Sequence, residues 1–143
     1  MEEADTTKTA QMEHCFYEGT GFQPVSSFKE WQIAYLNDTS ILRHGAVNYM
    51  ERHFETDEAF ILQNGSAILY LGGGAEEPRT ITAVKMLRGH VYQVRQNIWH
   101  NVALFSGTSL LLVEQKGTGM GNSELFSLPP TRLIEVEDCP AII

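Results

Sequence analysis

Apolar and polar residues alternate along much of this chain with a period of two. Trp31, Ile33 and Tyr35 alternate with Gln32 and Ala34, which predicts a strand with one apolar face. No apolar stripe at 3.6-residue spacing reaches helical length. Turn residues separate further short apolar runs, which predict strands near residues 47–53, 58–62, 66–71, 80–87, 91–95, 98–104 and 110–113. The pattern indicates an all-β sandwich or barrel and leaves immunoglobulin-like, lipocalin-like and jelly-roll topologies open.

Chemistry-bearing side chains gather between residues 45 and 65, in the stretch GAVNYMERHFETDEAFILQNG. Glu51 and His53 are two positions apart, so on a strand they point to the same face. Glu58 opens a second apolar run that ends at Asn64-Gly65, a pair that predicts a two-residue hairpin turn. We therefore expect acid, imidazole and acid to converge on one interior.

The same stretch resembles the first motif of the cupins. That motif is Gly, five residues, His-x-His, three or four residues, Glu, six residues, Gly. Here the positions are occupied by Gly45, Glu51, His53, Glu58 and Gly65. Every spacing fits, and glutamate replaces the first histidine.

The second cupin motif resembles residues 89–104 less closely. Gly89 and His100 match it, whereas Arg95, Asn97 and Leu104 stand where Pro, Gly and Asn are expected. The resemblance implies an all-β fold, namely a double-stranded β-helix or cupin jelly-roll barrel. Residues 28–143 would form one barrel domain with a C-terminal tail. Residues 1–27 would form an N-terminal arm, partly ordered or packed on a partner.

By this resemblance, four residues would bind a divalent transition metal: Glu51, His53, Glu58 and His100. Imidazole nitrogen and carboxylate oxygen are ligands of Mn, Fe, Ni and Zn, so the donor set fits any of these ions. Glu51 has two alternatives, a general base or an ion-pair partner of Arg52 or another surface charge. A hydrogen-bonded core residue is the alternative for each histidine.

Three further residues are candidates for the substrate pocket. Tyr49 shares the inward face and would act in catalysis or position substrate, with an ordinary core tyrosine as the alternative. Tyr92 is expected at the pocket rim, and an inward-pointing Arg95 would favour an anionic ligand. Asn101 follows His100 in a predicted strand, so its side chain is expected on the opposite face.

These features support several functions. The first is a metal-dependent enzyme with isomerase or lyase chemistry on a small polar molecule, carbohydrate-like or a hydroxy-acid. The second is a barrel that binds or senses a small ligand without turnover. A cupin dioxygenase and a purely structural scaffold are further alternatives.

Charge and composition narrow the partners. The chain has 18 acidic and 10 basic residues and a formal net charge of -8, which disfavours nucleic acid and acidic membranes. The polar N-terminal segment lacks the pattern of a secretory leader, so we expect a cytoplasmic protein in which Cys15 and Cys139 are free thiols. The resemblance also implies a homodimer that exchanges the N-terminal arm and the tail 141–143.

Overall fold

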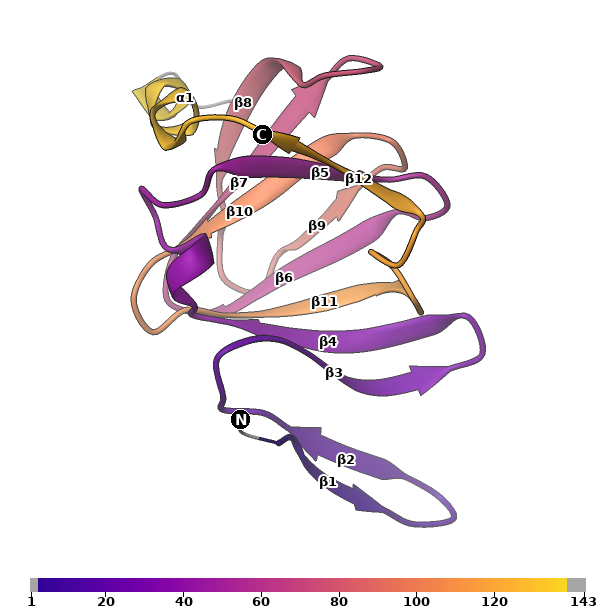
Figure 1. Ribbon diagram of the computed structural model, residues 1–143. Coiled ribbons are helices and arrows are strands. Elements are labelled where there is room, and N and C mark those ends of the chain that lie inside the picture. The colour runs from indigo at the N-terminus through magenta and orange to yellow at the C-terminus, as the bar shows by residue number, and fades with distance from the viewer. Residues whose placement is uncertain (1–2, 139–143) are drawn as a thin grey trace.

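Two antiparallel five-stranded sheets face each other in the computed structural model and enclose one apolar core (Figure 1). The structure describes residues 3–138; Cys139 and the tail 141–143 lie outside them. The first sheet has the order β12 (Ser123–Ser127), β5 (Tyr49–His53), β10 (Trp99–Leu104), β7 (Ala67–Gly73) and β8 (Arg79–Lys85). The second has the order β3 (Gly21–Phe28), β4 (Trp31–Asn37), β11 (Ser109–Gln115), β6 (Glu58–Asn64) and β9 (Val91–Val94). The all-β prediction is confirmed.

The turn at Asn64-Gly65 is present, but the predicted hairpin is wrong. Gly65 has a φ of +82°, which suits glycine, yet β6 and β7 belong to opposite sheets. The backbone after the turn bonds instead to the loop before β11. Thr108 Oγ1 accepts from Ser66 N at 3.1 Å and donates to Ser66 O at 2.8 Å. The Asn-Gly pair therefore turns the chain from one sheet to the other.

β4 forms as predicted, but the face with Trp31 and Tyr35 points away from the core. Ala34 and Leu36 are the residues of β4 that lie buried inside, while Trp31 is 44% exposed. Tyr35 packs edge-on against Phe16, with ring centroids 6.2 Å apart. Because both faces of this strand are apolar, alternation alone could not identify the inner one.

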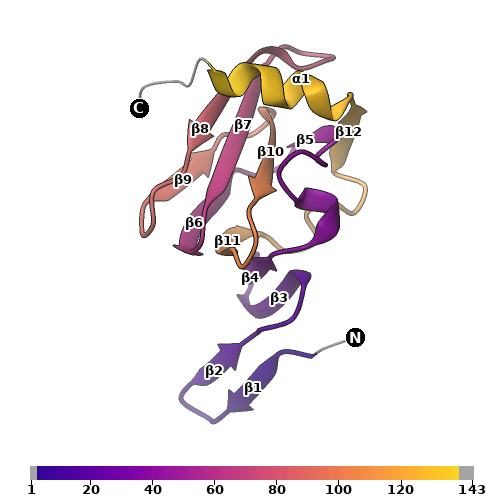
Figure 2. The ribbon, with the colours of Figure 1, turned by 90° about the vertical axis from the view of Figure 1, so that its left-hand side faces the viewer.

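The N-terminal segment forms a hairpin that projects beyond the second sheet (Figures 1 and 2). Its strands are β1 (Asp5–Lys8) and β2 (Glu13–Phe16), and they pair only with each other among the described residues. β3 also lies within residues 1–27, and it is an edge strand of the second sheet. The last part of the expected N-terminal arm therefore belongs to the barrel's second sheet.

The C-terminal part of the described chain packs on the outside of the first sheet (Figure 2). After η1 (Ser40–Leu42) near the start of the barrel, the described helical segments are α1 (Pro130–Glu135) and η2 (Val136–Asp138). Glu137 bonds both β7 and the segment between η1 and β5: Tyr70 Oη donates to Glu137 Oε2 at 2.7 Å, and His44 Nε2 lies 2.8 Å from Oε1. None of these helical segments, within residues 3–138, is long and apolar enough to span a membrane.

Candidate metal centre

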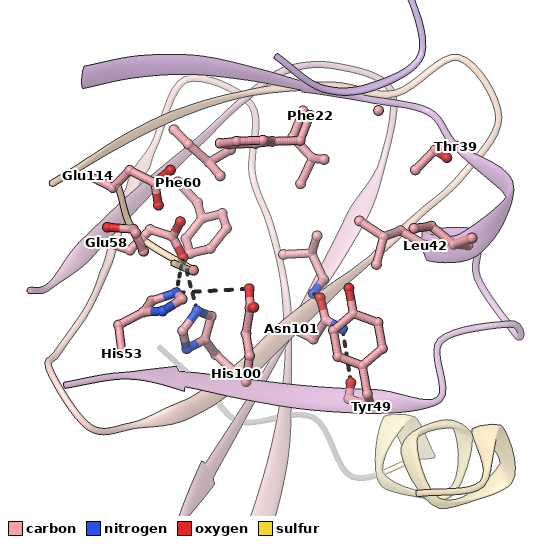
Figure 3. Close-up of a pocket in the computed structure, with 18 residues that line it drawn as sticks. Phe22, Thr39, Leu42, Tyr49, His53, Glu58, Phe60, His100, Asn101 and Glu114 are labelled. Carbon is pink, nitrogen blue, oxygen red and sulfur yellow. Dashed lines mark hydrogen bonds and ion pairs between the residues drawn. The ribbon is translucent and has the colours of Figure 1, made fainter. Parts of the chain in front are cut away.

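Three strands bring four possible metal ligands to one point in the barrel. β5 carries Glu51 and His53, β6 begins at Glu58, and β10 carries His100. Glu51 and His100 are direct cross-strand partners, so the sheet register itself places them side by side. One ligand atom from each residue lies within 4.8 Å of all the others. Figure 3 shows His53, His100 and Glu58 pointing into the same cavity.

Glu58 lies at the centre of this cluster. Its Oε1 is 3.0 Å from His100 Nε2 and 3.3 Å from His53 Nε2. Glu51 is further out, with Oε1 3.9 Å from His53 Nε2. Glu51 keeps 30% of its side chain exposed, against 4% or less for the other three. It is therefore the ligand candidate most open to the cavity.

The outer nitrogen of each imidazole is held by a hydrogen bond. His100 Nδ1 lies 2.9 Å from the carbonyl oxygen of Ile98, which only accepts. His53 Nδ1 lies 2.6 Å from Ser123 Oγ, which itself donates to Asn122 Oδ1 at 3.1 Å. Both Nδ1 atoms therefore donate, and both Nε2 atoms face the cluster. This is the orientation that metal-binding histidines need, so the residues fit a divalent ion.

The ionisable groups of the cluster shift one another's pKa values. Burial alone would raise the pKa of Glu58, but hydrogen bonds from His100, His53 and Glu114 outweigh it and hold the pKa well below its usual range. Burial would lower the pKa of His100, yet the hydrogen bond and charge of Glu58 raise it. The pKa of Glu51 is raised, mainly by burial. The cluster therefore favours positive charge beside Glu58, which a cation can supply.

Glu114 is a further ionisable residue of the cavity, and it lies outside both motifs in the sequence. It is only 5% exposed, lines the same cavity, and accepts a hydrogen bond from Gln32 Nε2 at 3.1 Å. Burial, with the hydrogen bond and charge of Glu58, raises the pKa of Glu114 to about 9. The sequence did contain a signal, because Glu114 continues the inward face of Leu110 and Leu112 at a spacing of two.

Tyr49 lines the cavity on the side away from the histidines (Figure 3). Burial, followed by the nearby charge of Glu51, raises the pKa of its phenol. Asn101 Nδ2 donates to the carbonyl oxygen of Tyr49 at 2.9 Å, and Asn101 Oδ1 accepts from Val102 N. The backbone pairing between β10 and β5 consists of one residue pair, His100 with Glu51. The hydrogen bond from Asn101 therefore adds a second link between these two strands.

Tyr92 and Arg95, the other two candidates for substrate binding, lie outside the cavity that contains the cluster. The side chain of Arg95 is 77% exposed and pairs with Asp57 at 3.3 Å. Tyr92 Oη accepts from Leu87 N at 2.8 Å, and Tyr92 lines a separate hollow between the sheets together with Arg95. Neither residue lines the metal-site cavity. Their suggested contact with the substrate of this site has no support in the structure.

Arg52 is also not a partner of Glu51. Its guanidinium binds Glu124 Oε2, with Nη2 at 2.6 Å, and lies over the ring of Trp99. Adjacent residues on β5 point to opposite faces, so this ion pair forms on the outside of the sheet. The alternative in which Glu51 pairs with Arg52 is therefore wrong.

No protein-family model and no curated protein matches this sequence. Solved structures do match. Pac13 of Streptomyces, a nucleoside dehydratase, has a TM-score of 0.56 at 9% identity, over 89% of this chain and 88% of that one. Hydroquinone 1,2-dioxygenase from Sphingomonas sp. TTNP3 has a TM-score of 0.52 at 12% identity, over 70% of this chain and 68% of that one.

KdgF from Halomonas sp. gives a TM-score of 0.51 at 12% identity, over 66% of this chain and 77% of that one. The chain has the cupin jelly-roll fold. At these identities the likeness concerns the fold, and it agrees with the spacing of the first motif. Within this cupin barrel, the four motif positions are the residues that form the cluster.

Proposed function

We propose that this cupin binds one divalent transition metal through Glu51, His53, Glu58 and His100 and catalyses proton transfer on a small polar molecule. The observation that carries the proposal is the convergence of four ligand atoms within 4.8 Å, with both Nε2 atoms turned toward the centre. Two carboxylates balance the charge of a divalent ion. Isomerase or lyase chemistry suits such a site, because it needs a base and only a modest Lewis acid.

The residues of the chain have distinct parts in this proposal. The bound metal would polarise a substrate oxygen. Glu51 is the carboxylate most open to the cavity, so it is placed to accept a proton from substrate, and burial raises its pKa in the metal-free site. Tyr49 lines the wall beyond Glu51 and would orient the substrate. Ser123 and the carbonyl oxygen of Ile98 hold the two imidazole rings in place, and buried Glu58 would bind the same ion.

Metal content tests the first half of the proposal. We expect near-stoichiometric Mn, Fe, Ni or Zn by elemental mass spectrometry in the wild type and its loss in His53→Ala/His100→Ala. The matched control is His90→Ala, since His90 is exposed and does not line the cavity. Equal metal in the wild type and the double variant would refute the assignment.

Solvent exchange tests the second half. Proton transfer would place deuterium from the solvent on a carbon of hydroxyketone or sugar substrates, which NMR detects. We expect exchange to stop after chelation and in Glu51→Gln. Exchange that survives exhaustive chelation would contradict metal-dependent catalysis. The homodimer and the cytoplasmic location stay predictions, which sedimentation and cell fractionation would check.

A further inference from the structure

The cavity over the proposed metal site has a marked charge bias. Its volume is about 250 Å³, and its ionisable wall residues include three carboxyl groups, from Glu51, Glu58 and Glu114, and two imidazoles. No lysine or arginine of residues 3–138 lines it. The two arginines nearest in sequence to the four ligand candidates are paired elsewhere, Arg52 with Glu124 and Arg95 with Asp57.

The rest of the wall is largely apolar. Figure 3 shows Phe22 and Leu42 across the cavity from His53, with Phe60 beside the cluster. Leu36, Ile41, Val102 and Leu112 also belong to this surface. A ligand that places oxygen atoms at the cluster would therefore lay its other end against aliphatic and aromatic side chains. Polar groups at that end of the ligand would lose their hydrogen bonds to water without gaining new ones from the wall.

Charge balance decides what kind of oxygen donor fits. If a divalent ion is bound, Glu51 and Glu58 already neutralise it. A carboxylate or phosphate on the ligand would then add a buried negative charge, and the described wall has no lysine or arginine to pair with it. Hydroxyl and ketone oxygens can approach the same ion without that cost.

We propose that the cavity selects an uncharged ligand, a vicinal diol or hydroxyketone that carries a compact apolar group, and rejects carboxylate and phosphate analogues. The inference rests on the proposed function, because it assumes that the metal is bound. It narrows the substrate class from small polar molecules in general, and it removes hydroxy-acids from that class.

Three probes with one carbon skeleton test the charge selection. 1-Phenyl-1,2-ethanediol is uncharged, mandelate is its anionic counterpart, and 2-phenylglycinol is its cationic counterpart. Calorimetry on Mn-loaded protein, with metal content measured first, should show the diol binding at least about tenfold tighter than either ion. In water mandelate is the better chelator, so a preference for the diol must come from the cavity.

Variants at the opening of the cavity test separately the selection against charged ligands and the contact with the ligand's apolar group. Ile41 lines the cavity and is 65% exposed, so Ile41→Lys should fold and place an ammonium group at the opening. It should reduce the preference for the diol over mandelate, whereas Ile41→Gln should not. Phe22→Ala should weaken the phenyl diol but leave 1,2-propanediol unchanged, since Phe22 supplies apolar wall.

Each outcome has a defined meaning. Mandelate or 2-phenylglycinol binding as tightly as the diol would overturn the inference, and so would binding of none of the three to metal-loaded protein. Failure to load metal is a separate result, which refutes the proposed function. In that case the diol should still exceed mandelate in the metal-free cavity, and the reverse order would overturn the charge argument as well.

Discussion

Ser123 should control metal affinity although it is not a ligand candidate. In the structure its hydroxyl donates to Asn122 Oδ1 and accepts from His53 Nδ1 at 2.6 Å. Ser123→Ala removes that acceptor from an imidazole whose residue is only 4% exposed. The proton would then move to Nε2, where Glu58 Oε1 can accept it at 3.3 Å. That tautomer blocks the nitrogen that the metal needs.

The size of the effect follows from these contacts. A buried donor without an acceptor costs about 1–3 kcal/mol, and the metal must restore that less favourable tautomer when it binds. About 1.4 kcal/mol corresponds to a tenfold change in Kd, so we expect metal affinity to fall about 10- to 100-fold. The metal-free protein can relax by shifting the proton, so its stability should change less than its metal affinity.

Competition with a chelator of known affinity would measure this difference. Ser127→Ala is the matched control, because Ser127 is an exposed serine on the same strand. Ser123→Thr keeps the hydroxyl and should retain most of the affinity. The reasoning would be refuted if Ser123→Ala bound metal within about twofold of the wild type, because the serine would then not set the tautomer.

Two other predictions concern stability. Tyr70→Phe should lower the free energy of unfolding by about 2 kcal/mol in urea titrations, because it removes a part-buried hydrogen bond to the Glu137 carboxylate; a loss below about 0.5 kcal/mol would contradict a charge-assisted bond. In metal-free protein, the raised pKa of Glu114 means that the folded state keeps this proton between pH 4.5 and about 9 while the unfolded state releases it. Its contribution to the free energy of unfolding therefore falls as the pH rises, by at most about 1.4 kcal/mol per pH unit. Glu114→Gln should flatten that decline when unfolding is compared at pH 5, 7 and 9, and parallel profiles for wild type and variant would contradict the assignment.

The sequence predicted those features of the fold and of the site that depend on one local pattern of residues. Alternation predicted the strands, and the spacing of Glu51, His53 and Glu58 placed them on facing strands. His100 needed the resemblance as well, because it lies far along the chain from the others. The structure confirms that these four side chains meet in space. Their role as ligands remains the proposal made above.

The features that the sequence did not predict correctly depend mostly on contacts between residues far apart in the chain. Both faces of β4 are apolar, so its inner face depends on what covers the outer one. The turn at Gly65 has the local chemistry of a hairpin, but Thr108 from a distant loop bonds the adjoining backbone. Arg95 was aligned with a motif position, yet Asp57 holds it at the surface. Glu114 lies outside both motifs, so only its place in the alternation of β11 marks it as inward-facing.

The pairing of β12 with β5 has a consequence for when the site can form during synthesis. β12 is the last strand of the described chain, and Ser123 is registered directly against His53. A ribosome must therefore release residues up to the end of β12 before Ser123 can fix the tautomer of His53 that leaves Nε2 free for a metal. Glu51, His53, Glu58 and His100 can meet earlier, but they do so as an unfinished site. Tight metal capture should then coincide with docking of the C-terminal strand, which would delay loading until the barrel is nearly complete.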